Sequence, residues 1–473
     1  MKLDKTICLG GHLNNKNVVG IKINGYYIYP NVKGITLVYS SSMASYLDEP
    51  TYKSFTGSTV IGSGTFMEYS SSLTYDEDNR PIRTVEIGTV NKINVTLSNR
   101  NKITTISKLK GNFGISFDGC KNLQDINFDS YSSEGVTNMA NMFNDCSKLK
   151  SLDLSHLDTS QVTTMEYMFR VCESLTELDT TGWITDNVTD MSAMFMNCKL
   201  LPFINVSGWN TSNVTDMSGM FLNCNKLASL DVSNFNTNNV VDMGLMFQSC
   251  YKLTSLDLSK WDTRNVTSMN GMFSSCTSLT TIEGAESLNT GNVTDMNNMF
   301  FDCHSLTSLD VSNFDVSNVE DMVSMFNHCS NLTEIDTSKW ENNKIYDMQG
   351  MFRNCLKLTK LDLSGFNTSN LWSMQYMFCN CQDLAELDLS NWNTSNMTFN
   401  EYAFQDCNSL HTLRLDNCNN ETIKDIVTSQ DFPTGYVNGE TRKIYCKEEN
   451  TFDPVYIEDR IVLPDGWEYV FVD

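Results

Sequence analysis

Apolar residues recur along the chain in a fixed order, which the stretch Asn213–Leu230, NVTDMSGMFLNCNKLASL, shows clearly. Counted from Met217, they stand at offsets 0, 3, 4 and 7 and end at Cys224, a spacing that puts them on one face of a helix about two turns long. Asp216, just before them, is typical of a helix N-cap. The pattern therefore predicts one short helix per copy, which packing against neighbouring copies must hold because so short a helix is marginal alone.

An alternating segment follows this helical pattern in each copy. Leu230–Ser233 alternates apolar and polar residues, as a strand with one buried face does, and Leu256–Ser259 and Leu387–Ser390 repeat it. Strands stack about 4.8 Å apart, whereas packed helices need about 10 Å. A straight stack cannot satisfy both distances, so we expect an arc with a parallel sheet on its concave side.

One cysteine per copy marks the period of the repeat. Successive cysteines are 26 residues apart, except for a step of 27 from Cys276 to Cys303. The twelve are Cys120, Cys146, Cys172, Cys198, Cys224, Cys250, Cys276, Cys303, Cys329, Cys355, Cys381 and Cys407. A fixed period of this length indicates a solenoid, in which each unit contacts mainly its neighbours. The predicted fold class is an α/β solenoid of about 12 coils, each with one short strand and one short helix.

The segments outside the repeats predict a further domain at each end. Val18–Tyr29, VVGIKINGYYIY, holds Asn24-Gly25 between two alternating runs, which favours a β-hairpin. Further strand-like runs follow it. We therefore expect a β-rich anchoring domain over residues 1–110, the solenoid over 111–418 and a C-terminal cap over 419–473.

The tail and one irregular copy carry their own expectations. In the tail, Ile423–Val427 predicts a short helix, and Trp467 is expected to cover the end of the core. In the copy that starts at Cys276, the segment Ile282–Ala285 replaces the usual Leu-Asp-Leu-Ser and brings one extra residue. We expect a bulge or local bend there.

Ten cysteines of the repeat are predicted to be structural core residues. They are Cys146, Cys172, Cys198, Cys224, Cys250, Cys276, Cys303, Cys329, Cys355 and Cys381. Side chains that point the same way have poor geometry for bridging one another, and buried thiols behave as small apolar groups. We expect reduced thiols and no metal site, because the chain has no paired Cys-x-x-Cys and its five histidines are scattered.

Asparagine recurs before a column of mostly valine residues. The column consists of Asn187, Asn213, Asn239, Asn265, Asn292, Asn318, Asn370 and Asn396. A buried amide can bond the backbone of its own and the next coil, and so satisfy groups that a turn would otherwise leave unpaired. We therefore expect these side chains to be structural.

The formal net charge of −24 disfavours nucleic acid as a partner, since binding to its backbone needs a basic surface. It favours solubility or a basic partner. Part of the charge forms one row on the predicted concave sheet face, the candidate binding site that we call the acidic row. Its members are Asp153, Asp179, Asp231, Asp257, Glu283, Asp310, Asp336, Asp362 and Asp388.

Two interpretations of the acidic row remain open. Like charges stacked at strand spacing repel, and a cation such as calcium or a basic partner would relieve the repulsion. The alternative is a row without a ligand, screened by water, salt and neighbouring hydroxyls. We predict no cofactor, with calcium as the candidate ion.

No targeting or membrane segment is evident. The first residues, Met1–Leu9, contain no apolar run of signal-peptide length, and no stretch of about 20 apolar residues exists. We therefore expect a chain that is made and folded in a cytoplasm and has no membrane span.

The repeat pattern N-V-T-D-M-x-x-M-F-x-x-C-x-x-L-x-x-L-D-L-S-x-F/W-x-T resembles the BspA-like leucine-rich repeats over about Phe117–Asn417. The resemblance implies a leucine-rich-repeat-like arc and a role in adhesion or recognition. Such proteins occur on bacterial and protist surfaces and in some bacteriophages. The family supplies no catalytic residues and no cofactor, and many members carry a secretion signal that is not evident here.

No catalytic motif emerges, and the regular recurrence of carboxylates argues against one unique reacting pair. We expect a non-enzymatic recognition or structural protein. The first candidate is a phage virion fibre or capsid decoration, whose N-terminal domain binds other virion or surface proteins and whose solenoid binds a host-surface glycan or protein. A bacterial cell-surface adhesin and an intracellular scaffold are the alternatives. The sequence leaves the oligomeric state open, a homo-oligomer included.

Overall fold

The structure, a computed structural model, describes residues 115–128, 131–452 and 460–472 in full, and otherwise only the backbone of the strands named below. The chain forms two compact units, residues 1–214 and 215–473. Counted by the cysteine column, four turns (Cys120 to Cys198) belong to the first unit and eight (Cys224 to Cys407) to the second. The boundary between the units therefore falls within the repeats.

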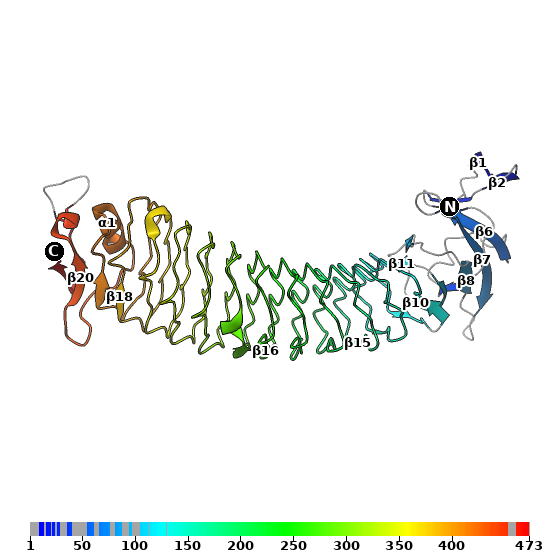
Figure 1. Ribbon diagram of the computed structural model, residues 1–473, viewed down its shortest axis with the longest axis horizontal. Coiled ribbons are helices and arrows are strands. Elements are labelled where there is room, and N and C mark those ends of the chain that lie inside the picture. Colours follow the sequence, from blue (N-terminus) through cyan, green and yellow to red (C-terminus); the bar gives the residue numbers. More distant parts are fainter. Residues whose placement is uncertain are drawn as a thin grey trace. The chain divides into compact units, whose positions relative to one another are not determined.

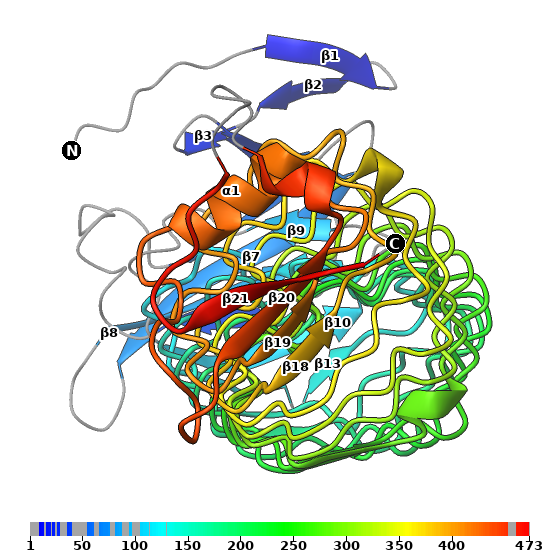
Figure 2. The ribbon, with the colours of Figure 1, turned by 90° about the vertical axis from the view of Figure 1, so that its left-hand side faces the viewer.

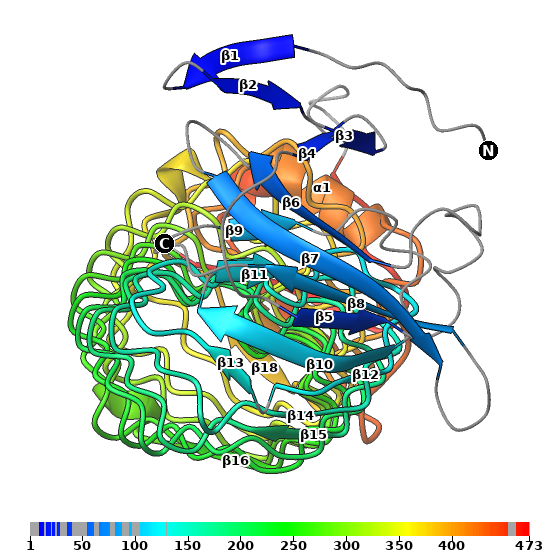
Figure 3. The same cartoon turned by 90° about the vertical axis from the view of Figure 1, so that its right-hand side faces the viewer.

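The first unit combines a mixed sheet with the first turns. Its strands are β1 (Leu9–Leu13), β2 (Lys16–Val19), β3 (Ile21–Ile23), β4 (Tyr26–Ile28), β5 (Thr36–Tyr39), β6 (Ser54–Val60), β7 (Phe66–Tyr75), β8 (Pro81–Ile87), β9 (Asn94–Thr96), β10 (Thr105–Asn112), β11 (Gly114–Ser116), β12 (Asp125–Ile126), β13 (Ser130–Ser132), β14 (Ser151–Asp153) and β15 (Glu177–Asp179). The largest sheet has the order β12-β10-β5-β8-β7-β6-β4-β3, with β13 also paired to β10 (Figure 3). The strands β3 and β4 pair antiparallel, as the predicted hairpin requires.

Strand β10 joins the N-terminal sheet to the repeats of the same unit. It runs antiparallel to β5 on one side and parallel to β12 and β13 on the other. These two short strands belong to the first turn of the repeat. The first turn therefore continues an existing sheet instead of ending on an open face.

The second unit contains short strands and little helix (Figure 1). Its elements are β16 (Ser255–Asp257), β17 (Thr281–Glu283), η3 (Ala285–Ser287), η4 (Thr368–Asn370), β18 (Glu386–Asp388), β19 (Thr412–Arg414), α1 (Asn420–Thr428), β20 (Arg442–Cys446), η5 (Glu448–Thr451) and β21 (Trp467–Phe471), where η marks a 3₁₀ turn. Among the described residues α1 is the single α-helix, and it lies after the last repeat.

The predicted helix in each coil is wrong, as Met243–Cys250 illustrates. Leu245 and Ser249 have φ of 59° and 60°, in the left-handed region that no right-handed helix contains. The Met246 and Cys250 amides donate to the carbonyl three residues earlier, at 3.3 and 3.1 Å. With the Gln248 amide, which donates to the Leu245 carbonyl, the segment forms three overlapping four-residue turns, and these place apolar residues at the same offsets as a helix would.

Every second amide of this segment, from Met243 to Ser249, links neighbouring turns of the repeat. Met243 donates to the Ser268 carbonyl at 3.1 Å, and Phe247 donates to the Met272 carbonyl at 2.9 Å. Backbone donors thus alternate between their own turn and the next. The fold is a β-solenoid of about twelve turns with little helix, not an α/β leucine-rich repeat with one helix per coil.

The predicted sheet of one strand per coil is present only in part. In the second unit β16 pairs with β17, and β18, β19, β20 and β21 form a parallel sheet. The equivalent residues of other turns form at most an isolated bridge, such as Glu334 with Lys360. Tight turns and single bridges replace the continuous ladder.

The core of each turn is filled by the columns of methionine, phenylalanine, cysteine and leucine. In the second unit the rings of Phe273, Phe300 and Phe326 stack with centroids 5.4 and 5.6 Å apart, and all three are fully buried. Each such side chain contributes about 1.5–3 kcal/mol through burial, and stacking adds to this. A second aromatic column lies beside the phenylalanine column, and in it the rings of Phe314 and Trp340 are parallel to each other.

The extra residue after Cys276 is absorbed in a 3₁₀ turn, not in the ladder. Gly284 adopts φ 79° and starts η3, while β17 stays paired with β16. Leu288 still fills the aromatic column and is 2% exposed. The expected irregularity is present, and it leaves the core unchanged.

The C-terminal tail extends the last sheet of the second unit and packs against it (Figure 2). The predicted helix lies inside α1, which begins at the capping side chain of Asn419. Trp467 is buried, and its Nε1 donates to the Pro433 carbonyl at 2.6 Å. Buried Arg442 donates to the carbonyls of Leu410, Asn408 and Thr434. The tail therefore satisfies carbonyls of the last turn as well as covering its apolar face.

Candidate binding surfaces

The acidic row lies on the outer side of the turns in each unit. Parallel pairing aligns Asp153 with Asp179, Asp257 with Glu283, and Asp388 with Arg414. Asp231, Asp310, Asp336 and Asp362 occupy the same position in turns without a ladder. The row ends on a cation, since the Arg414 Nε lies 3.7 Å from the Asp388 Oδ2.

Carboxylates of the acidic row accept hydrogen bonds from their own turn. The Oδ1 of Asp257 accepts from the Ser259 hydroxyl at 2.6 Å and from the Ser259 amide at 2.9 Å. A serine two residues later supplies an equivalent hydroxyl and amide to other members of the row. These donors, the hydroxyl more strongly than the amide, lower the carboxyl pKa of Asp153, Asp231, Asp257, Asp310 and Asp336. Donors that favour the charged form offset part of the mutual repulsion.

Metal ligation was the other way to relieve this repulsion. Across residues 115–128, 131–452 and 460–472, no group of three or more His, Cys, Asp or Glu side chains is placed to hold an ion. Calcium as a partner of the acidic row therefore gains no support from the geometry.

A second column of carboxylates occupies the predicted N-cap position. We call it the inner acid row: Asp216, Asp242, Asp295, Asp321 and Asp347. Its side chains accept from backbone amides as expected, but they close turns and cap no helix; the Asp295 Oδ1 accepts from the Asn297 amide at 2.9 Å. Parallel bridges link Asp295 to Asp321 and Asp321 to Asp347. Burial, and less strongly a neighbouring carboxylate, raises the pKa of Asp242, Asp295 and Asp347.

The opposite pKa shifts of Asp295 and Asp310 predict opposite effects of removing a charge. Asp295→Asn keeps an acceptor for the Asn297 amide but removes a half-buried charge, so the urea midpoint of unfolding should rise at pH 7. Because the pKa of Asp295 is raised in the folded state, this carboxyl destabilises the wild type only where it is charged. The wild-type stability is therefore fully present below the unfolded pKa, about 3.9, and part of it is lost as the pH rises through the folded pKa. The gain should therefore vanish at pH 3, which urea unfolding followed by circular dichroism measures.

Asp310→Asn in the acidic row is the matched control. The folded pKa of Asp310 is lowered, so its contribution is present above the unfolded pKa and is lost as the pH falls through the folded pKa. This substitution should lower the midpoint at pH 7, and the difference from the wild type should narrow at pH 3. Shifts of the same sign for both substitutions at pH 7 would contradict the assignment.

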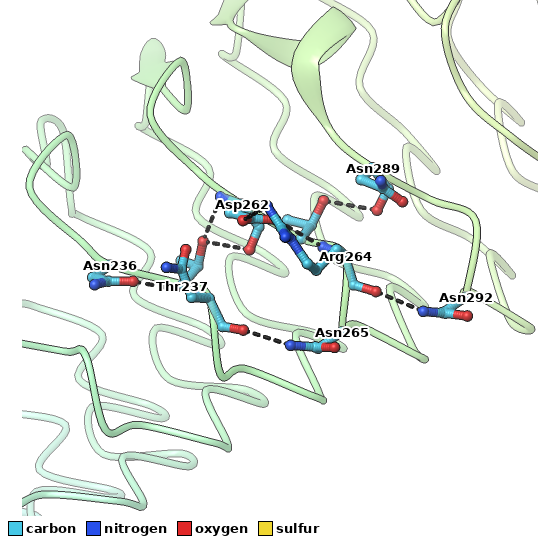
Figure 4. Close-up of polar contacts among 9 residues, drawn as sticks. Asn236, Thr237, Asp262, Arg264, Asn265, Asn289 and Asn292 are labelled. Carbon is cyan, nitrogen blue, oxygen red and sulfur yellow. Dashed lines mark hydrogen bonds and ion pairs between the residues drawn. The ribbon is translucent and has the colours of Figure 1, made fainter.

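Polar side chains also link neighbouring turns directly (Figure 4). Buried Thr237 donates its hydroxyl to the Asp262 carbonyl at 3.0 Å and accepts from the Asp262 amide at 2.9 Å. The asparagine column bonds the preceding turn: the Nδ2 of Asn265 donates to the Asn238 carbonyl at 2.7 Å. That asparagine side chain is exposed, so the expected burial is wrong, and the buried polar column is the threonine one.

The structure places all ten predicted core cysteines in the interior. Thiols donate to the carbonyl of the phenylalanine one turn earlier; Cys329 bonds the Phe300 carbonyl at 3.1 Å. Burial raises the pKa of Cys276 and Cys329 to about 12. The column thus combines a small apolar group with a donor that satisfies a buried carbonyl.

These thiols should be unreactive in the folded protein. Because the thiolate is the nucleophile and burial suppresses it, the column should react with iodoacetamide at pH 8 only as fast as the protein unfolds. Site-resolved mass spectrometry after timed labelling measures this. A Cys8→Ser background removes the one cysteine that lies outside the described residues. Rapid labelling of the column in the native state would contradict the burial.

Two shallow depressions lie on the second unit. One, of about 370 Å³, is lined by Asp362, Asp388 and Trp392, between two members of the acidic row. The other, of about 340 Å³, lies where Gly271 and Ser274 leave space between larger residues of the neighbouring turns. Both are open to solvent.

Sequence analysis missed three exposed aromatic residues in the second unit. Tyr346, Trp372 and Phe399 are 42%, 40% and 40% exposed, and we call them the aromatic patch. The signal was available, because Tyr346 and Trp372 stand where other copies carry threonine, as at Thr267 and Thr294. Averaging over copies hid this difference.

Comparison with known families gives one match. The model described as "Mycoplasma protein of unknown function, DUF285" matches residues 112–203, 202–305, 282–360 and 329–430, about two thirds of the chain. The chain belongs to this family. The DUF285 matches cover nearly all of the repeats in this chain, and the description assigns no function. No curated protein matches.

The described helices were also compared with what a membrane span requires. None of them has the length and the apolar character that crossing a bilayer requires.

Proposed function

We propose that this chain is a non-enzymatic recognition protein whose outward columns bind an extended partner. The observation that carries this is the register: equivalent side chains of consecutive turns are aligned by parallel pairing, as in Asp257 beside Glu283. A surface that repeats at a fixed interval suits a partner that is itself extended, such as a glycan or a peptide. Carboxylates that are equivalent from turn to turn leave no unique pair for catalysis.

The proposal extends to where the protein works. The resemblance to BspA-like repeats supports adhesion or recognition, and the buried thiols favour folding in a reducing compartment. We assign the chain to a bacteriophage virion, as a fibre or capsid decoration that contacts the host surface. In this assignment the N-terminal sheet holds the chain in the particle through other virion proteins.

Mass spectrometry and electron microscopy of the native source particle test the placement. A fixed stoichiometry on a virion would support it. Recovery from a bacterial cell envelope would replace it with the second candidate, a cell-surface adhesin, which the same resemblance favours.

Binding to arrayed glycans and host-surface proteins tests the recognition function itself. If the acidic row takes part, an Asp310→Asn/Asp336→Asn variant should lose binding. An Asp302→Asn/Asp406→Asn variant changes the net charge equally at another column, one where asparagine already occurs, and should bind normally. No arrayed ligand for the wild-type chain would overturn the function.

A further inference from the structure

One outward column of the second unit changes its chemistry part-way along. The column, which we call the outer ladder, runs through Val241, Thr267, Thr294, Glu320, Tyr346 and Trp372. Each amide donates to the carbonyl of the previous member, at 2.9 to 3.2 Å, so the side chains are held one turn apart. Threonine therefore gives way first to a carboxylate and then to two aromatic rings in consecutive turns.

The exposure of the aromatic patch is unusual where tryptophan is concerned. All seven tryptophans of the chain are described, and six of them are buried; Trp372 alone is exposed. Its ring meets that of Phe399 edge to face, with centroids 5.1 Å apart. A fixed, exposed cluster of aromatic side chains is typical of an interaction site.

Carboxylates surround one end of the patch. Glu320 precedes Tyr346 in the outer ladder, and Asp321 and Asp347 of the inner acid row adjoin them in sequence. Partial burial and these charges, Asp321 and Asp347 before Glu320, raise the pKa of the Tyr346 hydroxyl. The nearest lysine in sequence, Lys344, donates to the Asn318 Oδ1 at 2.6 Å. None of the ion pairs within the described residues involves Glu320, Asp321 or Asp347, so the negative charge beside Tyr346 is available to a partner.

We propose that the aromatic patch, together with Glu320 and Asp321, binds an arginine- or lysine-bearing segment of another protein. Cations are attracted to the faces of tryptophan and tyrosine rings, and neighbouring carboxylates add charge complementarity and hydrogen-bond acceptors. The inference deepens the proposed recognition function and rests on it, because it names the class of partner for that surface.

The same turns already hold an arrangement of this kind. The Arg353 guanidinium lies over the Tyr376 ring, 4.8 Å from its centroid, and Tyr376 stacks on Tyr402 at 5.0 Å. One pair of tyrosines is thus covered by an arginine of the chain itself. The aromatic patch has rings and carboxylates, but none of the ring–cation contacts within the described residues involves it.

Shielding of Trp372 in the full chain provides the test. The probe is an acetylated (Gly-Arg)₄ amide, and its control is the same peptide with citrulline, which keeps the shape of arginine without the charge. The arginine peptide should protect Trp372 from acrylamide quenching and from oxidation by N-bromosuccinimide, whereas the citrulline peptide should not. This measurement needs no variant, so it does not depend on how a mutant folds.

Isothermal titration of a Tyr346→Thr/Trp372→Thr variant separates the patch from general attraction to a chain of net charge −24. The variant keeps every charge and places in the ladder the residue that other turns carry there. We expect the Kd for the arginine peptide to rise at least about tenfold, which corresponds to about 1.4 kcal/mol. Val241→Thr, at another exposed position of the same ladder, should leave the Kd unchanged.

Equal affinity of the double variant and the wild type would overturn the inference, as would shielding of Trp372 by a chitooligosaccharide and not by the arginine peptide. If arrayed ligands bind the solenoid while the arginine peptide leaves Trp372 unprotected, the inference fails and the recognition function stands. If nothing binds the wild-type chain, both fail.

Discussion

Phe300→Ala should lower the free energy of unfolding by about 3–5 kcal/mol. Phe300 is fully buried, and its ring stacks between Phe273 and Phe326. Removing it leaves a cavity that two turns of the solenoid share, because the rings above and below are held by their own backbone bonds and cannot close it. Urea unfolding followed by circular dichroism at 222 nm and by tryptophan fluorescence measures the loss.

Phe203→Ala is the control for this substitution. Phe203 is 55% exposed, so the same truncation should change the stability by no more than about 0.5 kcal/mol. If Phe300→Ala moves the midpoint as little as Phe203→Ala does, the phenylalanine column is not the core.

Gly284→Ala should cost about 2–5 kcal/mol. Gly284 has φ 79°, where an L-residue costs roughly 1–2 kcal/mol, and a Cβ there would lie 2.4 Å from the Cα and N of Ser259. Because backbone atoms cannot move aside as a side chain can, the previous turn must shift, which typically costs a further 1–3 kcal/mol or so. Differential scanning calorimetry should show a large fall in Tm.

Gly439→Ala separates the clash from the backbone conformation. Gly439 has φ 82°, but a Cβ there would meet nothing within 4 Å. Its replacement should therefore cost only the conformational part, about 1–2 kcal/mol. Equal losses at the two glycines would show that close packing of η3 on the previous turn contributes nothing.

The repeat could be predicted from the sequence, but the shape of its helical segment could not be predicted from apolar spacing alone. A run of overlapping four-residue turns and a two-turn helix bury the same offsets, so the apolar spacing of Met243–Cys250 fits both. The distinction lies in the polar positions, where Gly271 and Asn354 are residues that favour left-handed φ. Leu245 and Tyr376 adopt the same conformation without that preference, since bonds to the neighbouring turns impose it.

Of the candidate sites, the acidic row could be predicted from the sequence, whereas the aromatic patch could not. The acidic row follows from the period, because most copies contribute an equivalent carboxylate and parallel pairing aligns several of them. Its partner groups, such as the Ser259 hydroxyl, lie two residues away and were visible in the sequence. The aromatic patch depends on departures of single copies from the common pattern, and its exposure follows from the outward direction of the ladder, which only the three-dimensional structure establishes.

The 3₁₀ turn at η3 has a consequence for how such a chain can change its length. The Cys303 thiol reaches the Phe273 carbonyl 30 residues back, where other turns span 29, and the bond is nonetheless made at 3.1 Å. Each turn offers its successor the same set of donors and acceptors that it receives from its predecessor. Within a unit, duplication or loss of a whole turn would therefore join surfaces that already match. Such a gene can lengthen or shorten by unequal recombination between its own repeats, and it can vary the ligand-facing columns copy by copy without redesigning the interior.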